Sequence, residues 1–104
     1  MGFLSKDKSS GTDVIHIECE EVMNISLAAN LHTRLRESLG KGGEIELHAA
    51  NVERIDAAVL QLFTAFFKAA AAKKVRARWI EPSDVVLRSA GLLGLTDKLN
   101  LTAG

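Results

Sequence analysis

The stretch that decides the fold of this chain is residues 52–62, VERIDAAVLQL. It follows a short apolar strand at residues 45–47 and leads into a long alanine-rich helix. Asp56 therefore stands at a loop-to-helix junction, where a carboxylate can accept hydrogen bonds from the free N–H groups of the first turn. We expect Asp56 to cap this helix, and the same residue can also contact a partner at an exposed helix start.

Hydrophobic periodicity on both sides of the 52–62 segment predicts alternating strands and helices. Alternation predicts strands at residues 14–19, 44–48 and 75–80, and Glu20 to Met23 form a turn or a short further strand. Apolar residues at helical spacing predict a helix from Asn24 or Ser26 to Leu39, with Ile25, Ala28, Leu31, Leu35 and Leu39 inward. Further helices are expected at 57 to about 73, after Pro82-Ser83-Asp84, and briefly after Thr96. This order favours an α/β fold with parallel strand pairs.

Length and composition indicate one ordinary globular domain. The chain has 104 residues, 47% of them hydrophobic and 25% charged, and its formal net charge is zero. Zero net charge gives no general attraction for nucleic acid. We interpret the polar residues 1–13 as a flexible N-terminal tail and residues 14–104 as the domain. One cysteine, no signal peptide and no apolar run of about 20 residues favour a cytoplasmic protein without direct membrane insertion.

The 52–62 segment and three further features resemble STAS domains, the fold of bacterial anti-sigma-factor antagonists. The further features are the amphipathic helix with Leu31 and Leu35, the WIEPS strand exit at 79–83, and LLGL at 92–95. The likeness covers roughly residues 14 to 99. It implies a mixed four- or five-stranded sheet with about four helices largely on one face. The Leu60-Gln61-Leu62 run is most similar to small single-domain STAS proteins, which include the STAS subunit of lipid-transport ABC complexes.

The resemblance implies a non-enzymatic protein-binding module for bacterial regulation by partner switching. The partner would be an anti-sigma or sensor kinase-type protein, docked on Asp56, Ala57, Ala58 and Gln61. The family usually has a phosphorylated Ser or Thr where this chain has Ala57, so this position cannot accept phosphate and binding should be constitutive or controlled through the partner. The alternative is a STAS subunit that binds the ATPase of a lipid-transport ABC complex. His48 replaces an Asp that is common in the family.

Catalytic and metal sites find little support in the sequence, and we expect no cofactor. His16 and Cys19 fall on opposite faces of their strand, and His16 and His48 lack an obvious third ligand, so no metal site is predicted. Cys19 is expected on the buried face of its strand, and the local sequence implies no base that could activate its thiol as a nucleophile. The basic cluster of Lys73, Lys74, Arg76 and Arg78 is interpreted as a solvated surface.

Overall fold

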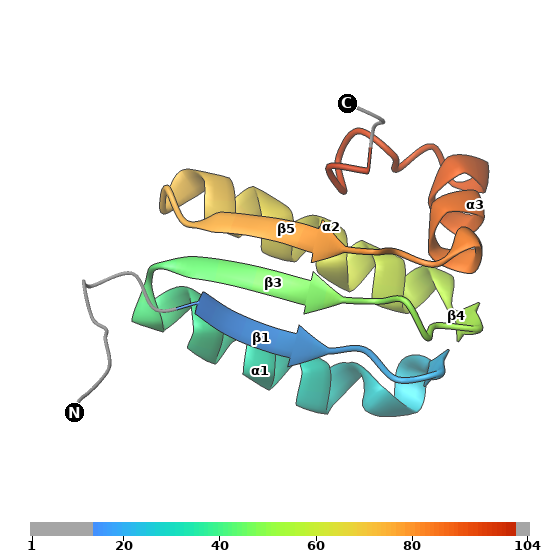
Figure 1. Cartoon of the computed structure of the whole chain (residues 1–104), viewed down its shortest axis with the longest axis horizontal. Coiled ribbons are helices and arrows are strands. Elements are labelled where there is room, and N and C mark those ends of the chain that lie inside the picture. The colour runs from blue at the N-terminus through green and yellow to red at the C-terminus, as the bar shows by residue number, and fades with distance from the viewer. Residues whose placement is uncertain (1–13, 102–104) are drawn as a thin grey trace.

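The computed structural model describes residues 14–101 and confirms the α/β class (Figure 1). Three strands form a parallel sheet in the order β1-β3-β5, with bounds β1 Val14–Glu18, β3 Glu44–His48 and β5 Arg76–Ile80. Helices α1 (Ala28–Lys41) and α2 (Ala57–Ala72) lie behind this sheet in Figure 1 and connect its strands. One face of the sheet is therefore packed against helices.

A second, smaller pair of strands lies where the carboxyl ends of the sheet strands meet the loops. Strand β2 (Val22–Met23) pairs in parallel with β4 (Arg54–Ile55), which is part of the 52–62 segment. Helix α3 (Asp84–Leu92) contacts β4 at this end of the molecule (Figure 1). The two-stranded ladder thus fixes the chain immediately before α2 begins.

The expected single mixed sheet with about four helices is wrong for the described residues. All described strand pairs are parallel, they divide into a three-stranded and a two-stranded sheet, and three α-helices are present in residues 14–101. The short last helix expected after Thr96 is instead a series of turns that ends with Asn100 at φ 55°. So short a segment gains too few hydrogen bonds to nucleate a helix on its own. The proposed tail, residues 1–13, lies outside the described residues, as do residues 102–104.

The start of the first helical segment also differs from the prediction. Residues Ile25–Leu27 form a 3₁₀ turn, labelled η2, and the Asn24 side chain accepts a hydrogen bond from the Ser26 N–H. A 3₁₀ turn has three residues per turn, so its side chains do not continue the stripe of the following α-helix. Ile25, which we expected inward, is consequently 67% exposed. Helix α1 runs to Lys41, two residues beyond the predicted end at Leu39, and Gly42 with φ 73° follows it.

The core lies between the sheet and the two long helices. Ile45 and Leu47 of the central strand are completely buried, as the alternation predicted. The Trp79 ring packs 5.0 Å from the Phe63 ring, measured between centroids, and its Nε1–H donates to the Leu99 carbonyl at 2.7 Å. The C-terminal turns are thereby attached to the core. None of the helices in the described part of the chain is both long and apolar enough to cross a membrane.

Ser83 connects α3 to the beginning of the 52–62 segment. Its hydroxyl donates to the Val52 carbonyl at 2.7 Å and accepts from the Val86 N–H at 3.3 Å, which makes it the cap of α3. This is the helix start that the sequence predicted at Pro82-Ser83-Asp84. The Ser83 side chain therefore stabilises the start of α3 and also binds the loop at Val52 that precedes α2.

We predict that Ser83→Ala lowers the free energy of unfolding by about 1–2 kcal/mol, because both the cap and the bond to Val52 are lost. Urea denaturation followed by circular dichroism measures the change. Ser89→Ala, within the same helix, is the matched control and should change stability by less than about 0.5 kcal/mol. Equal midpoints for the Ser83 variant and the native protein would contradict the double role of this hydroxyl.

Candidate functional site

The residues predicted to dock a partner all lie at the start of α2. Asp56 precedes the helix, Ala57 and Ala58 begin it, and Gln61 follows one turn later. All four are exposed, whereas the neighbouring Val59 and Leu60 are completely buried. The buried pair sets the helix against the sheet, so the exposed residues form one small surface on a fixed support.

Asp56 does not cap α2 with its side chain, and that part of the prediction is wrong. Its carbonyl accepts from the N–H groups of Val59 and Leu60, but its carboxylate accepts from the Ile25 N–H at 3.2 Å. The cause is the β2–β4 ladder, since the Asp56 N–H donates to the Met23 carbonyl and brings the carboxylate beside η2. Asp56 therefore joins two segments that are far apart in sequence.

This bond places an exposed apolar side chain close to the predicted surface. Ile25 is 67% exposed and its backbone is held by Asp56. Beside the start of α2 an open groove of about 450 Å³ separates α1 from α2, lined by Ala28, Ala29, His32, Ala58, Gln61 and Leu62. A second groove of about 440 Å³ shares His32 and Leu62 and continues along the same two helices. Because Ala28, Ala29 and Ala58 have small side chains, the backbone and apolar surface in this part of the groove are accessible to a binding partner.

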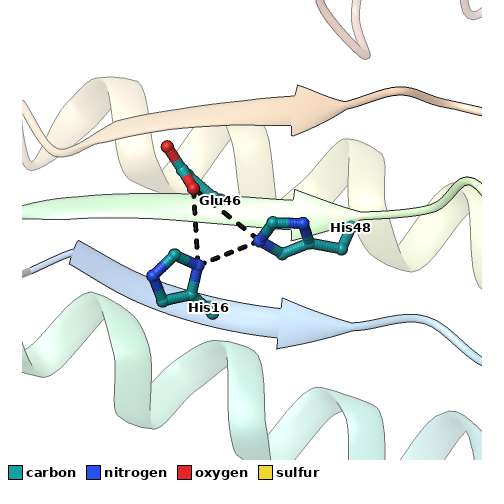
Figure 2. Close-up of side chains that lie close together, drawn as sticks. All are labelled: His16, Glu46 and His48. Carbon is teal, nitrogen blue, oxygen red and sulfur yellow. Dashed lines mark hydrogen bonds and ion pairs between the residues drawn. The ribbon is translucent and has the colours of Figure 1, made fainter.

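A cluster that the sequence analysis did not find lies on the other face of the sheet. His16 comes from β1, and Glu46 and His48 come from β3 (Figure 2). The parallel register places His16 directly opposite Glu46, and His48 is two residues further along β3 on the same face. Strand parity indicated that both histidines could face outward, but only the register between strands identifies Glu46 as their neighbour.

The polar atoms of this cluster approach one another closely. His16 Nδ1 lies 2.9 Å from His48 Nε2, and Glu46 Oε1 lies 3.4 Å from His16 Nδ1 and 3.7 Å from His48 Nε2. The other carboxylate oxygen, Oε2, accepts a hydrogen bond from Arg78 Nη2 at 2.7 Å. This hydrogen bond from Arg78 is the main reason that the pKa of Glu46 is lowered. The carboxyl group is therefore ionised in the neutral range.

Two members of the predicted basic cluster are paired with carboxylates. Arg76 Nη1 lies 3.1 Å from Glu44 Oε2, and Arg78 pairs with Glu46. The register explains both pairs, because Glu44 is opposite Arg76 and Glu46 is opposite Arg78. Opposite charges in these positions favour the observed strand pairing and reduce the positive field of this face.

Cys19 is buried, as its strand parity indicated. Burial raises the pKa of its thiol to about 11, so the thiol stays protonated at neutral pH. Because the thiolate is the form that attacks electrophiles or binds metals, this residue is suited to neither role. Its environment is that of a small apolar core residue.

We predict that Asp56→Ala destabilises η2, with faster amide hydrogen exchange at Ile25 and a loss of about 0.5–1.5 kcal/mol of unfolding free energy. Asp56→Asn keeps an acceptor oxygen and should retain most of the protection at Ile25. Exchange measured by NMR at single residues distinguishes the two variants. Unchanged exchange at Ile25 in Asp56→Ala would show that the carboxylate does not hold this turn.

Comparisons of the sequence with models of known protein families and with curated proteins found no match. Within residues 14–101, two arrangements of side chains are suited to binding: the start of α2 with its groove, and the His16–Glu46–His48 cluster on the sheet.

Proposed function

We propose that this protein is a non-enzymatic binding module of STAS type, which docks a regulatory protein on the start of α2. The observation that carries the proposal is the combination found there: an exposed Ile25, held by Asp56, beside the exposed Ala57 and Ala58. Exposed apolar groups on a rigid support are typical of protein-binding surfaces. The resemblance of the 52–62 segment to STAS domains assigns docking to the same residues.

The shape of the surface supports a protein partner over a small molecule. The groove beside Ala58 and Gln61 is open, and small side chains at residues 28, 29 and 58 permit another backbone to approach closely. An apolar side chain of the partner that packs into this groove would bury Ala58 and Leu62 together. The partner surface should therefore be apolar at its centre, with polar groups placed to meet Asp56 and Gln61.

The position of Ala57 bears on regulation. It is the first residue of α2 and is exposed, so a hydroxyl there would be accessible to a kinase. Alanine has no hydroxyl, and binding at this surface is not controlled by phosphorylation of residue 57. A kinase-type anti-sigma or sensor protein would then be held constitutively, or released by a change in the partner itself.

We predict that Ala57→Asp weakens capture of the natural partner at least tenfold, because it places an unpaired charge in the interface. The measurement is affinity capture from lysate of the source organism, with quantitative mass spectrometry of the proteins retained. Ala71→Asp is the matched control, since Ala71 is an exposed alanine near the other end of the same helix. Both variants should have the circular dichroism spectrum of the native protein.

The identity of the retained protein distinguishes the two candidate partners. A kinase-type regulatory protein lost only in Ala57→Asp supports the proposed module, whereas an ABC-transporter ATPase lost in the same way supports the alternative. Equal recovery of every retained protein by the native chain and Ala57→Asp would show that the start of α2 is not the docking surface.

A further inference from the structure

The outer face of the sheet carries polar side chains at paired positions of neighbouring strands. Alternation along β1 and β3 directs residues 16, 46 and 48 away from α1 and α2 (Figure 2). The cluster is accessible: the side chain of His16 is 57% exposed, that of His48 27% and that of Glu46 13%. An ion could therefore reach these three side chains from solvent.

The distances among the three polar atoms match those between the ligands of one metal ion. Zinc lies about 2.0–2.2 Å from histidine nitrogen and carboxylate oxygen, so two of its ligands in a tetrahedral site are about 3.3 Å apart. The observed separations are 2.9, 3.4 and 3.7 Å. Shifts of a few tenths of an ångström in these accessible side chains would bring all three atoms to the ligand positions.

The chemistry of the donors also selects the class of ion. Two imidazole nitrogens and one carboxylate oxygen suit zinc and neighbouring divalent transition metals, whereas magnesium and calcium prefer oxygen ligands throughout. Arg78 holds Oε2 of Glu46 and leaves Oε1 directed at both histidines. An outer partner of this kind fixes the orientation of a ligating carboxylate.

We propose that His16 Nδ1, His48 Nε2 and Glu46 Oε1 form a binding site for a divalent transition-metal ion, with Zn²⁺ the best match. The three protein ligands leave a fourth tetrahedral position open to solvent. The ion would replace the hydrogen that otherwise joins the two imidazoles. Binding would connect β1 to β3 and stabilise the folded chain, because a single ion would bridge both strands.

The test is isothermal titration calorimetry of the full chain, freed of any affinity tag, with ZnCl₂ at about pH 7.5, because metal binding releases protons from its ligands and is therefore weakened by acid. We expect one zinc ion per chain. Each of His16→Gln, His48→Gln and Glu46→Gln should reduce the affinity about tenfold or more. The matched control is His32→Gln, because His32 is an exposed histidine on α1 and the only histidine outside the cluster. Its affinity should equal that of the native protein.

A second measurement locates the ion independently of the variants. Long-range ¹H–¹⁵N spectra of the native protein should show zinc-dependent shifts at the Nδ1 of His16 and the Nε2 of His48, with the signals of His32 unchanged. MgCl₂ at the same concentration should produce neither heat nor shifts. The three glutamine variants must have the native circular dichroism spectrum, which the position of the side chains on the sheet surface favours.

Three results would overturn the proposal. The first is the absence of zinc-dependent heat and shifts. The second is equal affinity for zinc in the native protein and all three cluster variants. The third is a stoichiometry of one ion per two chains, which would mean that one chain does not hold a complete set of ligands.

Discussion

The parallel pairing of β1, β3 and β5 is the constraint on which the rest of the structure depends. Strand β3 lies between the other two, and its inward residues Ile45 and Leu47 are completely buried beneath the helices. Because side chains alternate along a strand, burying these two directs Glu44, Glu46 and His48 to the opposite face. The hydrophobic core thus determines which polar groups meet on the surface.

The same strand pairing positions both candidate sites, which lie in different parts of the molecule. On the outer face, the register sets His16, Glu46 and Arg78 in one row across three strands. At the carboxyl ends of the strands, the chain leaves the sheet and the β2–β4 ladder positions Asp56 beside η2. One arrangement of strands therefore supports a proposed metal site and a proposed docking surface without overlap between their residues.

The sequence predicted what depends on local periodicity and failed where separate segments meet. Alternation and helical spacing located the three main strands and the core helix from Ala57, and the residues Pro82-Ser83-Asp84 located the start of α3. These patterns could not show that the Asp56 carboxylate accepts a hydrogen bond from Ile25, because the two residues are 31 positions apart in sequence and meet only in the folded chain. Glu46 was missed for the same reason, since strand parity indicates a face but not the residue opposite His16. The two-residue strand β4 is too short to produce a periodic signal.

The most direct test of this account is the register of the central sheet in solution. In a ¹⁵N- and ¹³C-labelled sample, nuclear Overhauser effects between backbone protons report which residues face one another. We predict contacts typical of parallel strands around Ile15 and Ile45 and around Ile45 and Ala77, which place His16 opposite Glu46. An antiparallel pattern, or a pairing shifted by one residue, would contradict this register, because His16 would then no longer lie opposite Glu46 on the same face of the sheet.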